Sequence, residues 1–153
     1  MNDYNSKKIK ILIVEDSEDF KNLLRDFLTK QGIEVVNTSN GKEALKILDN
    51  TQLDLVLSDI RMPEMDGVVL LKKIKEKQPS LPVILMTGFS HILETETAHS
   101  LGASDFISKP FDLKDLLLII KKNTGTKDSK DPSQPSQQKT FSRYILLFFH
   151  THR

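Results

Sequence analysis

The chain has 153 residues, with 22 basic and 21 acidic side chains, a formal net charge of +1, 38% hydrophobic residues and no cysteine. This length fits one domain of about 150 residues, and the composition is that of a globular protein rather than a disordered chain. The absence of cysteine excludes disulfides, thiolate metal sites and a cysteine nucleophile, and the near-zero charge gives no reason to expect direct nucleic-acid binding.

The first part of the chain predicts two strands, each followed by a helix. Residues 9–14 are rich in β-branched apolar side chains, as in a buried parallel strand. A helix is predicted between an N-cap at Ser17 and a C-cap at Gly32, with its apolar face at helical spacing: Phe20, Leu23, Leu24, Phe27 and Leu28. A short strand follows over 34–37. A second helix opens at Asn40, with Glu43 in capping-box position.

The rest of the body continues the alternation of strands and helices. Strands are predicted over residues 53–58, 83–87 and 104–108, and helices over residues 66–77, 92–100 and 112–122. Five strand-then-helix units with short connections predict an α/β fold, in which a parallel sheet carries helices on both faces.

The composition divides the chain into three parts. Residues 8–124 form the predicted folded body. Residues 125–140 have the Gly, Pro, Ser and Gln content of a flexible linker. Residues 141–153 form a short apolar and basic tail, too short to fold alone. The tail could pack on the body, dimerise, touch a membrane surface or be the remnant of a lost or truncated output module, and the sequence leaves these possibilities open.

Targeting signals are missing from the sequence pattern. The first eight residues are polar, and the apolar run that follows is shorter than the roughly 7–15 residues of a signal peptide. No stretch approaches the ~20 apolar residues that span a membrane. We therefore expect no membrane span and a cytoplasmic location.

Charged and hydroxyl side chains follow the predicted strands. Glu15 and Asp16 come after the first strand, Asp59 after the third, Thr87 ends the fourth, and Lys109 follows the fifth. Because the carboxyl ends of parallel strands meet at one edge of a sheet, these groups should lie together. Three neighbouring carboxylates raise each other's pKa, and a hard cation such as Mg²⁺ relieves their repulsion. A metal beside a lysine suits a phosphoryl group in transfer.

Asp59 is the predicted phosphoryl acceptor, because it lies at a strand end and a carboxylate can accept a phosphoryl group. The adjacent Glu15 and Asp16 suit metal binding better than nucleophilic attack. The alternative, that an acidic residue merely caps or opens a helix, fits a different set better: Glu18, Asp19, Asp66 and Asp112.

Four stretches of this sequence resemble the receiver domain of bacterial two-component response regulators. They are residues 11–16 (ILIVED), 55–67 (LVLSDIRMPEMDG), 82–88 (PVILMTG) and 102–111 (GASDFISKPF). The resemblance covers roughly residues 8–123. It is to the stand-alone members of the family, which are similar to the chemotaxis regulator. It implies a doubly wound five-stranded parallel sheet with the flavodoxin-like strand order 2-1-3-4-5.

The resemblance also implies a role for each site residue. Asp59 would accept a phosphoryl group from a histidine kinase or a histidine phosphotransfer protein, and Glu15, Asp16, Asp59 and the main-chain carbonyl of Arg61 would hold Mg²⁺. Thr87 and Lys109 would bind the phosphoryl oxygens.

Three further expectations come from the same resemblance. Phe106 would be the switch aromatic, without the hydroxyl of the more frequent tyrosine. The bond between Lys109 and Pro110 would be a cis peptide. Arg61 and Phe89 would flank the phosphoryl group, exclude water and slow self-dephosphorylation.

The expected output is a protein contact made by the surface of the fourth helix, fifth strand and fifth helix. The 29 residues after the body are too few for a helix-turn-helix or ATPase domain. Five consecutive apolar residues, 116–120, exceed what one helix face buries, so Leu118 or Ile119 should be partly exposed. That exposure would mark either a helix edge covered by a neighbouring segment or a homodimer surface.

Three alternative functions remain at this point. A Mg²⁺-dependent phosphohydrolase would place a second aspartate two residues after the nucleophile, and Arg61 occupies that position, so we expect no enzyme beyond slow self-dephosphorylation. The others are a phosphate-independent interaction module and a truncated remnant of a multidomain regulator. The partner kinase, the pathway and the oligomeric state are not encoded in any pattern that we recognise.

Overall fold

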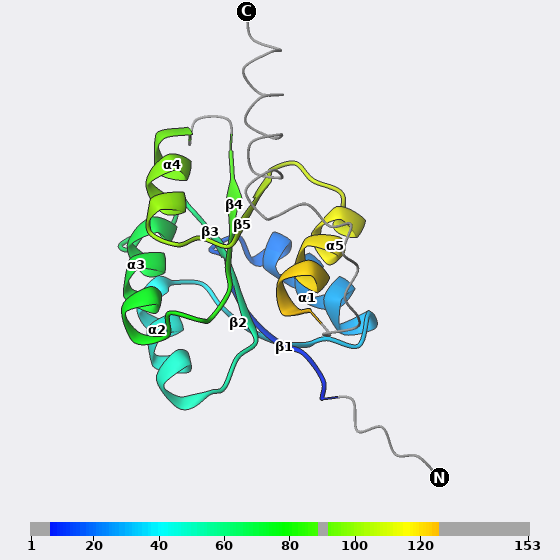
Figure 1. The fold of residues 1–153 in the computed structure, drawn as a ribbon. Coiled ribbons are helices and arrows are strands. Elements are labelled where there is room, and N and C mark those ends of the chain that lie inside the picture. The colour runs from blue at the N-terminus through cyan, green and yellow to red at the C-terminus, as the bar shows by residue number, and fades with distance from the viewer. Residues whose placement is uncertain (1–6, 89–91, 126–153) are drawn as a thin grey trace, which may run out of the picture.

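The computed structural model describes residues 7–88 and 92–125. Five parallel strands form one sheet in the order β2-β1-β3-β4-β5, and helices cover both of its faces (Figure 1). This confirms the predicted α/β fold and strand order. The strands are β1 (Lys10–Val14), β2 (Glu34–Thr38), β3 (Leu55–Asp59), β4 (Val83–Thr87) and β5 (Asp105–Ser108). The helices are α1 (Glu18–Lys30), α2 (Gly41–Asn50), α3 (Gly67–Lys77), α4 (Ile92–Ser100) and α5 (Leu113–Thr124).

The sheet separates two apolar cores, because successive side chains of a strand point to opposite faces. Ile11 and Ile13 of β1 pack with α1 and α5, whereas Leu12 and Val14 pack with α2, α3 and α4. Figure 1 shows these two groups of helices on opposite sides of the sheet. Both faces are buried, which explains why the strands read as continuous apolar runs.

Helix N-termini account for two of the differences from the predicted bounds. In α1, α2, α3 and α5, a side chain just before the helix accepts a hydrogen bond from a backbone N–H of the first turn: Ser17, Asn40, Asp66 and Asp112. Two of the predicted helices therefore begin one residue later than expected, at Gly67 and Leu113. At the end of α1 the C-cap is Gln31, and the predicted C-cap Gly32 is the next residue, with a φ of +81° that favours glycine.

Five strand bounds differ from the prediction by one or two residues, and the hydrogen bonds explain two of them. β3 begins at Leu55 rather than at residue 53, because the Asp54 carboxylate accepts the hydrogen bond from Lys10 N at 2.8 Å in place of a strand carbonyl. β2 extends to Thr38, whose carbonyl accepts a hydrogen bond from Glu15 N at 3.1 Å. The pairing of β1 with β2 therefore continues one residue beyond the end of β1.

Residues 126–153, which hold nearly all of the predicted linker and the whole predicted tail, lie outside the described residues, as do Phe89 and His91. The boundaries 8–124, 125–140 and 141–153 therefore stay predictions. Within the described ranges, none of the helices combines the length and the apolar character that crossing a membrane requires.

The side chain of Thr38 offers a test of the packing at the sheet edge. Its Oγ1 is buried and has no hydrogen-bond partner among the described residues. A buried unsatisfied hydroxyl costs about 1–3 kcal/mol, so Thr38→Val should raise the free energy of unfolding in chemical denaturation. Thr38→Ser, which keeps the hydroxyl and loses a methyl group, should lower it. A loss of stability in Thr38→Val would contradict this account.

Candidate functional site

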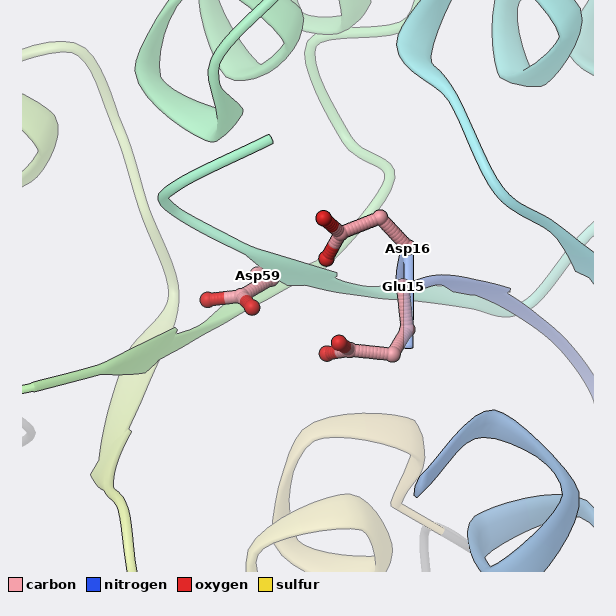
Figure 2. A group of neighbouring side chains, drawn as sticks. All are labelled: Glu15, Asp16 and Asp59. Atoms are coloured by element: carbon pink, nitrogen blue, oxygen red, sulfur yellow. The ribbon is translucent and has the colours of Figure 1, made fainter. Parts of the chain in front are cut away.

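The predicted acidic residues lie together at the carboxyl edge of the sheet. Glu15 and Asp16 follow β1, and Asp59 ends β3, where the register pairs Val14 with Ser58. One carboxylate oxygen from each of the three residues lies within 4.8 Å of the other two, and Figure 2 shows the three side chains at neighbouring strand ends. Among the described residues, this is the one group of three or more acidic, histidine or cysteine side chains close enough to share a metal ion.

The three carboxylates differ in burial. Glu15 is 1% exposed and Asp59 is 8% exposed, whereas Asp16 is exposed. Glu15 N donates a hydrogen bond to Thr38 O of β2, so Glu15 continues the pleated conformation of β1. Because successive side chains of a strand point to opposite faces, the Asp16 side chain lies on the other face from that of Glu15. Ser17 N also donates to Glu15 Oε1 at 3.1 Å. The site therefore combines two buried charges, which need a partner, with one hydrated carboxylate.

Lys109 supplies the partner for both buried carboxylates. Its Nζ donates to Asp59 Oδ2 at 2.8 Å and to Glu15 Oε2 at 3.1 Å. Its backbone N–H donates to Thr87 O at 2.7 Å, and the peptide bond to Pro110 is cis, as the resemblance implies. A lysine ammonium has three donors and no acceptor, so it can serve two carboxylates at once.

The pKa values of Glu15 and Lys109 are both raised, for different reasons. Burial, followed by the charge of Asp59, raises the pKa of Glu15 to about 7, although Lys109 and the Ser17 N–H favour the ionised form. Burial alone would lower the pKa of Lys109, but the hydrogen bond and charge of Asp59, together with the charge of Glu15, outweigh it and raise that pKa. Lys109 is therefore a fixed cation at neutral pH.

Thr87 and Phe106 lie on the other side of the sheet from Lys109. Thr87 is 6% exposed, and its Oγ1 lies 3.4 Å from Ser108 Oγ at the end of β5. Phe106 is partly buried against the core beneath α2, α3 and α4. The hydroxyl and the aromatic ring that the resemblance assigns to the switch thus share one face of neighbouring strands.

The loop after β3 is held by backbone contacts. Gly67 N donates to Ile60 O at 2.7 Å, and a Cβ on Gly67 would lie 2.9 Å from Ile60 Cα and closer still to Asp59 O, so only glycine fits there. Met65 N donates to Pro63 O at 2.8 Å around Glu64, whose φ is +68°. These contacts close the loop between the end of β3 and the start of α3.

Arg61 does not join the acidic cluster with its side chain. Its guanidinium nitrogen donates to Glu94 Oε1 in α4 at 2.6 Å, and the Arg61 side chain is 64% exposed. The second predicted flanking residue, Phe89, lies outside the described residues.

The donor set fits a hard divalent cation. Glu15, Asp16 and Asp59 offer only carboxylate oxygens, which Mg²⁺ prefers, and the exposed Asp16 leaves one side open to water ligands. Lys109 compensates part of the charge of the same cluster without contributing a metal ligand.

Comparison with known proteins places this chain in a family. The family model described as the response regulator receiver domain matches residues 11–121. The chain belongs to the response regulator receiver domain family. Receiver domains are signalling modules of two-component systems rather than metabolic enzymes.

Relatives and solved structures agree with this family. The chain is 38% identical over 128 residues to the DNA-binding transcriptional regulator NtrC of Proteus hauseri, covering 83% of this chain and 27% of NtrC. It is 34% identical over 137 residues to the response regulator SaeR of Staphylococcus aureus, covering 90% of this chain and 59% of SaeR. The crystal structure of the NtrX receiver domain from Brucella abortus superposes with a TM-score of 0.72 at 33% identity, covering 76% of this chain and 99% of that domain.

The chain thus spans about a quarter of NtrC and under two thirds of SaeR. What it shares with the NtrX structure is nearly the whole receiver domain. The likeness therefore concerns the receiver domain.

Sequence reasoning missed three contacts of this receiver site. They are the Phe20 ring, which lies 4.7 Å from Lys109 Nζ, the Ser108 hydroxyl beside Thr87, and the Glu94 carboxylate bound to Arg61. Each joins elements that are far apart in the chain, so no local spacing could reveal it.

The raised pKa of Glu15 predicts a pH dependence of stability. In the unfolded chain Glu15 has its ordinary pKa of 4.5, so between that pH and about 7 the unfolded state binds fewer protons than the folded state. Without divalent metal, the contribution of Glu15 to the free energy of unfolding should fall as the pH rises through this window. Denaturation of wild type and Glu15→Gln at several pH values measures it. A difference between the two proteins that does not change with pH would contradict the raised pKa.

Proposed function

We propose that Asp59 is the phosphoacceptor of this receiver domain and that a histidine kinase or histidine phosphotransfer protein is the donor. One Asp59 carboxylate oxygen forms a bond to phosphorus while the phosphorus–nitrogen bond of the donor imidazole breaks, and the imidazole nitrogen keeps the electron pair. One observation carries the proposal: Asp59 ends β3 beside two further carboxylates and accepts a hydrogen bond from Lys109.

Glu15, Asp16, Asp59 and the main-chain carbonyl of Arg61 are the proposed ligands of Mg²⁺. The ion, when bound, supplies positive charge that offsets the charge of the phosphoryl oxygens in transfer. The support is the shared oxygen chemistry of the three carboxylates and their mutual distances below 4.8 Å.

After transfer, the charge distribution around Asp59 changes and its hydrogen bonds rearrange. Lys109 N–H groups, which now reach Asp59 and Glu15, would pair with a phosphoryl oxygen. The Thr87 hydroxyl would leave Ser108 for a second phosphoryl oxygen, and Phe106 would turn inward with it. Phosphorylation thereby biases a two-state equilibrium of the β4–α4–β5 region.

The proposed output surface is the side formed by α4, β5 and α5. Leu118 of α5 is 66% exposed, which confirms that the apolar run exceeds one buried face, while Ile119 is partly buried. A large exposed apolar side chain on a helix surface is suited to a protein contact. We propose that a downstream protein or a second copy of the chain binds this side, and no direct nucleic-acid contact is proposed.

The phosphoacceptor proposal predicts a site-specific gain in mass. Wild type incubated with Mg²⁺ and a small phosphodonor such as phosphoramidate should gain one phosphoryl group, seen by intact mass spectrometry. Asp59→Asn should gain none, and a chelator should abolish the gain in wild type. No gain in folded wild type would favour the phosphate-independent module, and a gain in Asp59→Asn would place the acceptor elsewhere.

Arg61 is proposed to lengthen the lifetime of the acyl phosphate. Its side chain is held by Glu94 across the loop that follows Asp59, where it can hinder a water molecule that approaches the phosphorus. Because a guanidinium stays protonated, Arg61 cannot act as the general acid of a phosphohydrolase, which argues against that alternative.

The phosphate lifetime tests this role. Arg61→Ala should shorten the half-life of the phosphorylated protein about threefold, a change equivalent to about 0.65 kcal/mol in the hydrolysis barrier. Arg25→Ala is the matched control, because the Arg25 guanidinium pairs only with the adjacent Asp26 in the described contacts. An Arg61→Ala half-life equal to that of wild type would remove Arg61 from the account.

A further inference from the structure

Phe20 lies against the ammonium group on which the proposed chemistry depends. Its ring is in the first turn of α1, and Lys109 Nζ lies 4.7 Å from the ring centroid. The same Nζ donates to Glu15 and Asp59, so the ammonium group has carboxylates and an aromatic face as its neighbours. An aromatic face carries negative electrostatic potential and attracts a cation at this distance.

The sheet places these groups on one side. Side chains two residues apart in a strand lie on the same face of the sheet, so Glu15 shares a face with Ile13, and Asp59 shares one with Leu57. Ile13 and Leu57 both belong to the core under α1 and α5. Phe20 packs against that same core. A residue of α1 is therefore positioned to contact a side chain that enters from the end of β5.

The ring is itself held in place by a second aromatic side chain. Phe111, two residues after Lys109, meets the Phe20 ring at a centroid distance of 5.8 Å and an interplanar angle of 60°. Edge-to-face contact of this kind is a favourable arrangement of two rings. Phe20 thus links α1 to the segment that carries Lys109.

We propose that Phe20 is a positioning residue for phosphoryl transfer to Asp59, acting by holding the Lys109 ammonium group over the acidic cluster. A lysine has a flexible four-carbon stem, and restricting it before reaction lowers the entropic cost of meeting a phosphoryl oxygen. This inference rests on the proposed phosphoacceptor role of Asp59. An aliphatic residue at position 20 would fill the core but leave the ammonium group without its aromatic contact.

The test compares phosphorylation rates of variants under identical Mg²⁺ and phosphoramidate. Phe20→Leu should slow the gain of the phosphoryl group about 2- to 10-fold, the range expected for the loss of a cation–π contact, and Phe20→Tyr should restore the rate. Phe27→Leu is the matched control, because Phe27 is a partly buried phenylalanine of the same helix and core. It should keep the wild-type rate.

A double-mutant cycle separates positioning from general packing. If Phe20 acts through Lys109, Phe20→Leu should have no further effect on the rate once Lys109→Met is present. An equal effect in both backgrounds, or equal slowing by Phe27→Leu, would overturn the proposal. So would a wild-type rate in Phe20→Leu while Asp59 is phosphorylated normally, and that result would leave the proposed function intact.

The geometry also has a readout that needs no phosphoryl group. Protons of the Lys109 side chain that lie over an aromatic face are shifted upfield by the ring current in NMR spectra. The shift should persist in Phe20→Tyr and disappear in Phe20→Leu. Its absence from wild type would overturn the proposal, and failure of wild type to accept phosphate would overturn the proposed function and this role with it.

Discussion

Two carboxylates buried at one edge of the sheet, those of Glu15 and Asp59, depend on a single cation, Lys109. Lys109 follows β5, which lies two strands from β3 and three from β1 in the sheet. Because neighbouring strands are about 4.8 Å apart, the ammonium must reach roughly 10 Å across β4 to meet Asp59. The long unbranched stem of a lysine makes that reach on the face of α1 and α5, opposite to the face that carries the Thr87 side chain.

The fold serves this interaction by fixing which face each residue occupies. Glu15, Asp59 and Lys109 meet on the side of α1 and α5, whereas Thr87 and Phe106 lie toward α2, α3 and α4. Since a slip of one residue would move a side chain to the other face, the two buried cores hold the register that the site requires. The proposed phosphoacceptor Asp59 and the proposed switch residues Thr87 and Phe106 therefore lie on opposite faces of the sheet, at the same strand ends.

The sequence predicted the elements and the strand-end residues because both depend on local signals. Short apolar runs and helical patterns located the strands and helices of the described residues, and the strand ends located Asp59 and Lys109. Some bounds were wrong where a side chain replaced a backbone partner, as Asp54 does before β3 and Asp66 before α3. Phe20, Ser108 and Glu94 escaped prediction because their partners come from distant parts of the chain.

The central claim is that the Lys109-bridged acidic cluster binds a phosphoryl group on Asp59 together with Mg²⁺. Beryllofluoride, a tetrahedral mimic of a phosphoryl group on a carboxylate, tests this directly by ¹⁹F NMR. The account predicts a bound fluorine signal in wild type only when Mg²⁺ is present, and none in Asp59→Asn. No bound signal in folded wild type with Mg²⁺, or an equal signal in Asp59→Asn, would contradict it.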